Sequence, residues 1–285
     1  MKIPKRLQPL LEEGLIDEVQ SQLMSGKEAD IFIVRCHGEV RCAKVYKDAV
    51  TRSFKKAALY HEGRKTRGGR SARAMTKRSR YGREQQEDVW QTAEVDALAR
   101  LLKAGVRVPE TYGCVDGVLL MELIKDDEGY AAPRLNDVIL TVDQALEDHA
   151  VMMEYIKMML CAGIVHGDLS EFNVLLDEYG PVIIDLPQAV NAAANNNAQS
   201  MLARDINNMR DYYSAFAPDI KQTRYAEEIW TLYEEGKLRP DTPLTGLYED
   251  SDVLADVDAV VEEIKAIEKE EQARLDRLSE QLSDH

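Results

Sequence analysis

The amino-acid sequence predicts an α+β protein of two lobes, a small β-rich N-terminal lobe and a larger α-helical C-terminal lobe. Short apolar runs alternate with polar residues through the first 124 residues, and apolar residues recur at helical spacing after residue 140. With 285 residues and 45% apolar side chains, the chain can bury a sizeable core, which excludes wholesale disorder. A cleft between two such lobes is a natural ligand site.

The composition indicates a protein of a reducing aqueous compartment. No window approaches 18 consecutive apolar residues, and the first six residues lack the apolar region of a secretory signal. Four cysteines, Cys36, Cys42, Cys114 and Cys161, form no C-x-x-C pair, so neither a disulfide framework nor a zinc ribbon is indicated. We therefore expect a cytoplasmic protein with no membrane partner.

Two β-hairpins are predicted in the N-terminal lobe. The first joins Ile31–Val34 to Val40–Tyr46 through a compact His-Gly-Glu turn. The second joins Thr111–Val115 to Val118–Ile124 through the dipeptide Asp116-Gly117, which favours a tight turn. These runs predict the sheet of the smaller lobe.

A basic stretch and a helix separate the two hairpins. Residues 52–83 hold twelve lysine and arginine side chains against one glutamate, Glu62, so the local charge is +11. The remaining 24 basic and 50 acidic side chains give the rest of the chain a charge of −26. We expect a flexible basic loop over residues 52–87, either simply solvated or able to bind an anionic partner. Apolar spacing then predicts a helix over Glu84–Lys103, ended by Gly105.

The second half of the chain reads as mainly helical. A Met-rich apolar face repeats through Thr141–Cys161, and we interpret it as core, because methionine fills irregular gaps. Two short apolar runs follow at residues 174–176 and 182–184, and helical patterns resume from Ala198. A charged tail over residues 252–282 predicts a long exposed helix. The expected segments are an N-terminal extension (1–14), the N-lobe (15–124), the C-lobe (125–235) and an acidic helical extension (236–285).

The clearest chemical signal is the octet His166–Asn173, HGDLSEFN, followed by Asp185 at the end of an apolar run. An aspartate with an asparagine five residues later, here Asp168 and Asn173, is the spacing of a phosphotransferase catalytic loop. In such a loop the aspartate accepts or orients the acceptor proton, and the asparagine oxygen binds Mg²⁺ beside a second carboxylate. The pattern therefore predicts a metal-dependent phosphotransferase.

Three upstream features appear in the order that this chemistry needs. Lys44 lies on a predicted strand, where a kinase places the lysine that neutralises nucleotide phosphates. Glu94 lies on the following helix and could orient Lys44 by an ion pair. The end of the last strand, Met121, Glu122 and Ile124, fits a linker whose backbone meets adenine.

Over about residues 15–215 the chain closely resembles the RIO family of atypical serine/threonine protein kinases. Four motifs carry the resemblance: Ser25–Phe32 (SGKEADIF), Cys42–Lys47 (CAKVYK), His166–Asn173 (HGDLSEFN) and Ile184–Gln188 (IDLPQ). The resemblance implies a trimmed, protein-kinase-like RIO core that binds ATP with Mg²⁺ or Mn²⁺ and autophosphorylates on serine. It also implies that the usual activation and substrate-binding loops are absent.

The resemblance further implies roles for particular residues. Asp168 would be the catalytic base, Asn173 and Asp185 would hold the metal, and Lys44, anchored by Glu94, would pair with phosphate. The phosphate loop would be Ser25, Gly26, Lys27 and Glu28, whose backbone N–H groups and Ser25 and Lys27 side chains contact phosphates; the chain has no G-x-G-x-x-G motif.

Two sequence features point to different RIO subfamilies. Roughly 15 residues precede the core, which is too few for a winged-helix domain, so the chain looks like a prokaryotic member of the subfamily without one. Leu186-Pro187-Gln188, however, resembles the winged-helix subfamily. Relatives act in small-subunit ribosome maturation, so the resemblance implies a ribosome-related particle as partner, although an acidic surface does not by itself support ribosome binding.

Three functions stay open from the sequence. The first is a serine/threonine protein kinase, and the second is an ATPase switch that forms an aspartyl-phosphate on Asp185. The third is a small-molecule kinase of the aminoglycoside phosphotransferase type, since His-Gly-Asp also occurs there. Ser170-Glu171-Phe172 and the Ser25–Ala29 loop argue against the third.

Overall fold

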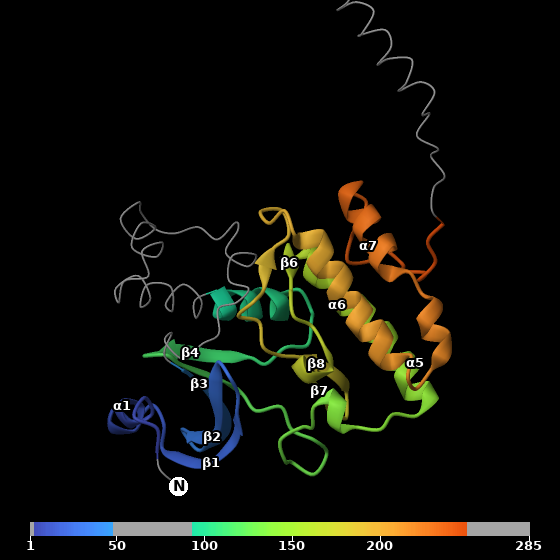
Figure 1. The fold of residues 1–285 in the computed structure, drawn as a ribbon. Helices are drawn as coiled ribbons and strands as arrows, with labels where there is room; N and C mark the ends of the chain where they lie inside the picture. Colours follow the sequence, from blue (N-terminus) through green and yellow to red (C-terminus); the bar gives the residue numbers. More distant parts are fainter. Residues whose placement is uncertain (1–2, 48–92, 250–285) are drawn as a thin grey trace, which may run out of the picture. The chain divides into compact units, whose positions relative to one another are not determined.

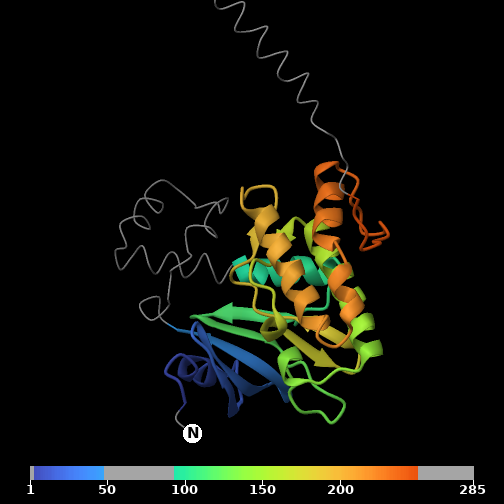
Figure 2. The same cartoon turned by 45° about the vertical axis from the view of Figure 1, so that its right-hand side comes forward.

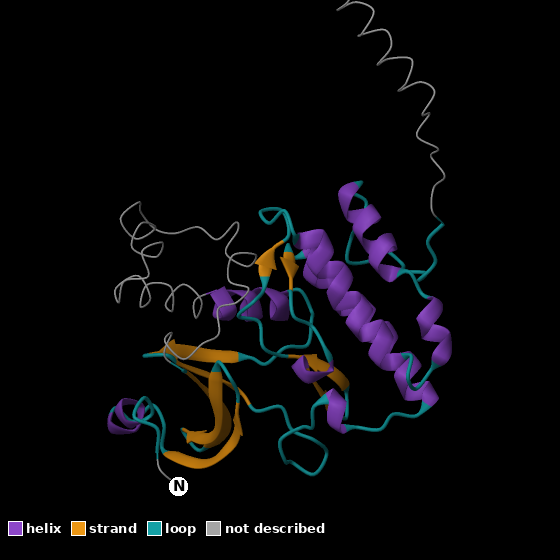
Figure 3. Cartoon of the chain, in the orientation of Figure 1, coloured by secondary structure: helices purple, strands orange, loops and turns teal. Residues whose placement is uncertain are grey.

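The computed structural model describes residues 3–47 and 93–249, and these residues form the predicted β-rich and helical lobes (Figures 1 and 3). A five-stranded antiparallel sheet in the order β1-β2-β3-β5-β4 builds the N-lobe. Its strands are β1 (Glu18–Ser25), β2 (Ala29–Cys36), β3 (Glu39–Tyr46), β4 (Thr111–Val115) and β5 (Val118–Glu122). A helix over residues 93–103 buries Leu98 and Leu101 in the large core.

Both predicted hairpins are confirmed, and their turns have the conformation that tight hairpins require. His37 and Gly38 join β2 to β3 with φ of 50° and 83°, and Asp116 and Gly117 join β4 to β5 with φ of 48° and 77°. Positive φ at both central residues matches the right-handed twist of the paired strands. The turn residues thus set the register that places Lys44 on β3.

Strand β1 and the short helix α1 (Gln8–Glu12) were not among the predicted elements. Strand β1 lies at the edge of the sheet, and most of its side chains are exposed on both faces, so its sequence lacks a regular apolar alternation. Helix α1 is too short to show a helical period, yet its Leu10 packs with Phe32 and Val34 in a small core on the sheet. The pairing of β1 with β2 and the packing of Leu10 are long-range contacts, which the local sequence pattern does not reveal.

Three predicted features lie partly or wholly outside the described residues. They are the start of the helix predicted over Glu84–Lys103, the basic loop 52–87 and the tail helix 252–282. Among the helices of residues 3–47 and 93–249, none combines the length and the apolar character that crossing a membrane requires.

The C-lobe is built on α5 (Val142–Cys161) and α6 (Ala198–Tyr213), which run side by side, with α7 (Tyr225–Glu234) against them (Figures 1 and 2). Thr141 caps the N-terminus of α5 through a reciprocal capping box with Gln144, so the helix begins at the predicted position. Two small antiparallel pairs and three 3₁₀ turns complete the lobe: β6 (Ile164–Val165) with β9 (Val190–Asn191), β7 (Val174–Asp177) with β8 (Gly180–Ile183), and η1 (Leu135–Asp137), η2 (Glu171–Asn173) and η3 (Pro218–Gln222).

The Met-rich face of α5 is core, as the sequence indicated. Met152, Met153 and Met159 are fully buried and pack with α6 side chains such as Met209. The same cluster includes Leu169 of the predicted catalytic loop. The core therefore continues directly beneath the site described below.

Residues 236–247 pack on the C-lobe. Lys157 on α5 donates from Nζ to the Thr242 carbonyl at 2.7 Å, and the Glu228 carboxylate on α7 accepts from the Gly246 N–H at 2.8 Å. Leu238 is buried in the large core. The unit that contains both lobes ends at Leu247.

Candidate active site

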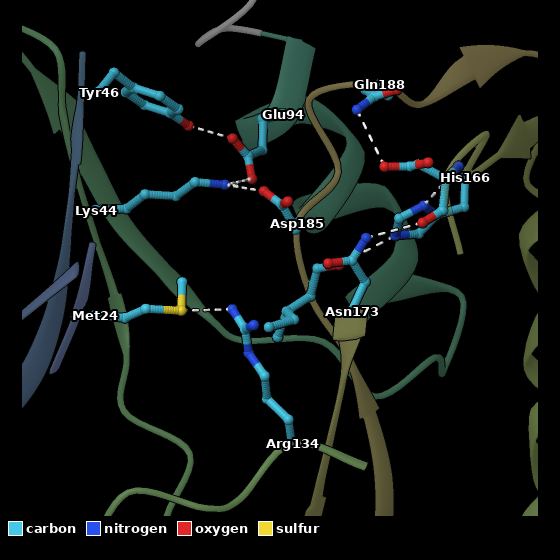
Figure 4. Close-up of polar contacts among 11 residues, drawn as sticks. Met24, Lys44, Tyr46, Glu94, Arg134, His166, Asn173, Asp185 and Gln188 are labelled. Carbon is cyan, nitrogen blue, oxygen red and sulfur yellow. Dashed lines mark hydrogen bonds and ion pairs between the residues drawn. The ribbon is translucent and has the colours of Figure 1, made fainter. Parts of the chain in front are cut away.

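Lys44 lies between two carboxylates that come from different lobes (Figure 4). Its Nζ is 2.7 Å from Oε1 of Glu94, on the helix of the N-lobe, and 2.6 Å from Oδ1 of Asp185, which follows β8 in the C-lobe. The Lys44 and Glu94 side chains are 7% and 2% exposed, whereas that of Asp185 is 42% exposed. The structure therefore brings together three residues that lie 50 and 141 positions apart.

The charges of this triad support one another. Burial by itself lowers the pKa of Lys44, but the Asp185 and Glu94 carboxylates outweigh burial and raise that pKa above its usual value. Burial likewise raises the pKa of Asp185, yet the charge and hydrogen bond of Lys44 outweigh it, so this pKa lies below its usual value. Tyr46 donates its hydroxyl to Oε2 of Glu94. Lys44 is thus a fixed cation and Asp185 a carboxylate at neutral pH.

Asp185 has a backbone conformation that is unusual for its residue type. Its φ of 67° lies in the left-handed region, whereas the other two non-glycine residues with positive φ in the described chain, His37 and Asp116, occupy hairpin turns. Next to it, the Ile184 N–H donates to the Asn173 carbonyl at 3.0 Å. Strained backbone of this kind concentrates at functional sites, where the surroundings hold it in place.

The predicted catalytic loop is a compact turn held by its own side chains. The Asn173 amide donates from Nδ2 to the Asp168 carbonyl at 2.8 Å, and the Asp168 N–H donates to Nδ1 of His166 at 3.3 Å. His166 is buried, and its Nε2 lies 3.1 Å from the Ile184 carbonyl, which links the loop to the Asp185 segment. Asp168 itself is exposed to solvent.

Three residues of α6 that the sequence analysis did not single out anchor this loop. Asp205 accepts from the N–H groups of Gly167 at 2.7 Å and Leu169 at 3.0 Å. Arg204 donates to the Gly167 carbonyl, and Asn208 donates to the Leu169 carbonyl at 2.8 Å. The loop backbone is therefore held on both sides of Asp168.

A signal for Asp205 was present in the sequence. It sits on the apolar face of α6, beside Leu202, Ile206 and Met209, where a charged residue is unexpected unless it has partners. Burial raises the pKa of Asp205 to about 6, although the His166 charge and the two N–H donors oppose that rise.

The predicted phosphate loop forms the turn between β1 and β2. Ser25 donates from Oγ to Oδ1 of Asp30 at 2.6 Å, and the Gly26 N–H donates to the Ala29 carbonyl at 2.9 Å. Lys47, whose role the sequence analysis did not assign, donates to the Gly26 carbonyl at 2.6 Å and also contacts Ser25 and Asp30. Lys27 is exposed and Glu28 half-buried in the same turn. Lys47 thus adds a second cation at this loop.

The predicted adenine linker joins β5 to the C-lobe. Met121 lies within β5, Glu122 accepts from the Glu110 N–H, and the buried Ile124 accepts from the Ala132 N–H at 3.0 Å. A cavity of about 610 Å³ touches Glu122 and Ile124, but the residues that line it do not include Lys44, Asp168 or Asp185. This cavity therefore lies apart from the Lys44 triad.

Solved structures share the fold. The Rio2 kinase from Chaetomium thermophilum, solved as an ADP/Mg²⁺-phosphoaspartate complex, matches with a TM-score of 0.56 and 21% identity, covering 96% of this chain and 80% of that one. At this identity the match shows the fold alone, and it confirms the predicted two-lobed kinase-like architecture.

Curated relatives match over most of the chain. The RIO-type serine/threonine-protein kinase Rio1 of Haloferax volcanii is 31% identical over 207 residues, which cover 72% of this chain and 66% of that protein. The human serine/threonine-protein kinase RIO1 is 30% identical over 228 residues, which cover 78% of this chain and 38% of that protein. The chain thus spans about two thirds of the first relative and less than half of the second.

A family profile described as the RIO domain matches residues 30–226, which include Lys44, Glu94, the catalytic loop and Asp185. The match covers more than half of the chain and confirms the resemblance carried by the sequence motifs. The protein therefore belongs to the RIO family.

Proposed function

We propose that this protein transfers the γ-phosphoryl group of ATP, with Mg²⁺, to serine or threonine hydroxyl groups of proteins, its own chain included. The observation that carries the proposal is the Lys44 ammonium held between Glu94 of one lobe and Asp185 of the other. A solvent-facing strand lysine would not be buried with two carboxylates from separate lobes. The curated relatives named above as serine/threonine-protein kinases support a protein acceptor over the small-molecule alternative.

The residues present suit a hard divalent cation. Nδ2 of Asn173 is committed to the Asp168 carbonyl, so the side-chain oxygen is the atom that a metal would take. The half-exposed Asp185 carboxylate is ionised beside Lys44 and supplies a second oxygen ligand. Carboxylate and amide oxygens are the ligands that Mg²⁺ and Mn²⁺ prefer. Bound there, the cation would neutralise charge on the phosphates.

Lys44 and the β1–β2 turn are assigned to nucleotide binding. Lys44 pairs with phosphate oxygens, and Glu94 fixes the direction of its side chain. The turn Ser25, Gly26, Lys27 and Glu28, with Lys47 beside it, offers N–H groups and cations to further phosphate oxygens. The backbone of Met121, Glu122 and Ile124 is assigned to the adenine base.

Asp168 is assigned as the catalytic base. The acceptor oxygen forms a bond to the γ-phosphorus while the bond from that phosphorus to the bridging oxygen of ADP breaks, and Asp168 receives the hydroxyl proton. Anchoring of the loop by Asp205 keeps the carboxylate in place without the protein having to reorganise during transfer.

Incubation of the full chain with γ-labelled ATP and Mg²⁺ tests the proposal. We expect labelled phosphoserine or phosphothreonine on the wild-type protein and a rate about a hundredfold to ten-thousandfold lower in Asp168→Asn, with near wild-type nucleotide affinity. Asp185→Asn should instead weaken Mg²⁺-dependent binding of a fluorescent nucleotide. Asp219→Asn, an exposed aspartate on η3, is the matched control. An unchanged transfer rate in Asp168→Asn would contradict the base assignment.

A second candidate is an ATPase switch with a phosphoryl group on Asp185. The side chain of Asp185 is 42% exposed and ionised, as an attacking carboxylate must be, and the Rio2 structure named above is a phosphoaspartate complex. Neutral hydroxylamine cleaves acyl phosphates and leaves phosphoserine intact. Label that hydroxylamine removes, that Asp185→Asn abolishes and that appears with free phosphate would favour the switch.

Partners and location extend the proposal. The +11 charge of residues 52–83 suits an anionic partner, and the family resemblance favours a ribosome-related particle in the cytoplasm. Binding to purified small ribosomal subunits that falls steeply with added salt would support an electrostatic contact of this kind.

A further inference from the structure

We propose that Gln188 is a positioning residue that orients the Asp168 carboxylate toward the acceptor hydroxyl; this inference rests on the proposed function. Gln188 donates from Nε2 to Oδ2 of Asp168 at 3.2 Å (Figure 4). Gln188 ends the motif Ile184–Gln188 and lies three positions after Asp185. It therefore links the segment of the proposed metal ligand to the proposed base.

The fold places these two side chains together through a short strand pair. β6 runs directly into the catalytic loop and β9 directly follows the Gln188 segment, and Val165 pairs with Val190 in antiparallel register. Asp168 lies three residues beyond Val165, and Gln188 lies two residues before Val190. The catalytic loop and the Gln188 segment are therefore adjacent, because both extend from the Val165–Val190 pair.

A tight turn fixes the backbone beneath Gln188. The Ala189 N–H donates to the Leu186 carbonyl at 3.0 Å, which closes a four-residue turn with Pro187 at its second position. Proline fixes φ at that position, and Leu186 is buried in the core, so the turn has little freedom. The remaining freedom of Gln188 lies in its side chain, and the hydrogen bond to Asp168 restrains it.

Different groups hold the backbone and the carboxylate of Asp168. Asn173 donates to the Asp168 carbonyl, and the Asp168 N–H donates to His166, so residues of the loop hold the Asp168 main chain. Gln188 instead contacts a carboxylate oxygen. Because an amide is neutral and does not titrate, it orients the carboxylate without competing for the proton that the carboxylate receives. Loss of this donor should disturb the acceptor end of the reaction and spare the nucleotide.

The test measures autophosphorylation of the full chain with γ-labelled ATP for wild type, Gln188→Met and Gln188→Glu. Methionine keeps the length and loses the donor, and glutamate adds a negative charge beside Asp168. We expect the rate at saturating ATP to fall about ten- to hundredfold in Gln188→Met, the size expected for one hydrogen bond to a charged group, and further in Gln188→Glu. Three quantities should stay at wild-type values: the ATP concentration that gives half of the maximal rate, the Kd of a fluorescent ADP analogue, and Tm.

Gln222→Met and Gln222→Glu are the matched controls, because Gln222 is exposed at the end of η3. A wild-type rate in Gln188→Met would overturn the inference and leave the proposed function standing. A lower rate accompanied by an equally weakened ADP affinity or a lowered Tm in both Gln188 variants would also overturn it, because that result indicates packing alone. Absence of any transfer by the wild-type chain would instead refute the proposed function.

Discussion

The Lys44 triad predicts that removal of the lysine harms stability as well as activity. Lys44→Met keeps an unbranched side chain but removes the ammonium between Glu94 and Asp185. Glu94, which is 2% exposed, then keeps only the Tyr46 hydroxyl as a donor among the contacts described above. Breaking a buried ion pair from one side leaves an uncompensated buried charge, which costs about 3–5 kcal/mol.

The two carboxylates contribute unequally to that cost. Asp185 is 42% exposed, so water screens it and its share is small. Most of the lost free energy of unfolding should therefore come from Glu94. A substitution that removes the unpaired charge of Glu94 should recover it. In Lys44→Met/Glu94→Gln the neutral amide can still accept from Tyr46, and we expect more than half of the lost free energy of unfolding to return.

Urea denaturation of wild type, Lys44→Met, Glu94→Gln and the double variant, analysed as a double-mutant cycle, measures the coupling between Lys44 and Glu94. Lys44→Met should lower Tm by on the order of 10 °C, and the double variant should regain stability without regaining phosphoryl transfer. A cost below about 1 kcal/mol for Lys44→Met, or a double variant no more stable than the single one, would refute this account of the triad.

Two further predictions concern α5 and α6. Asp205→Ala leaves two buried N–H groups of the catalytic loop without this acceptor, so we expect it to lower the free energy of unfolding by about 2–4 kcal/mol and to remove most of the activity. The exposed control Asp211→Ala should change neither quantity. Equal effects of the two variants would contradict the anchoring role. Burial, together with the Arg210 charge, lowers the pKa of His149 to about 4, so the free energy of unfolding should be full above pH 6.5 and fall by about 3 kcal/mol as the pH drops toward 4. Urea denaturation across this pH range should show that the free energy of unfolding falls less steeply with decreasing pH in His149→Phe than in wild type. The same pH dependence in both proteins would contradict the burial argument.

Local sequence patterns predicted the features that depend on neighbouring residues. Asp116-Gly117 indicated one hairpin turn, the period of Thr141–Cys161 indicated α5, and the spacing of Asp168 and Asn173 indicated the catalytic loop. In each case the signal lies within a few residues, because turn geometry, helical periodicity and a single loop are local. The structure places these segments where the patterns predicted them.

Contacts between residues that are distant in the chain became visible only in the folded structure. The pairing of Lys44 with Asp185 crosses 141 positions, and the anchoring of Gly167 by Asp205 crosses 38. The sequence did not predict strand β1, because its side chains are mostly exposed and show no apolar alternation. Pairing with β2 places it in the sheet. Gln188 meets Asp168 because β6 and β9 pair, and two-residue strands leave almost no pattern in the sequence. Such contacts depend on how segments distant in the sequence pack together, and the spacing of neighbouring residues does not show this.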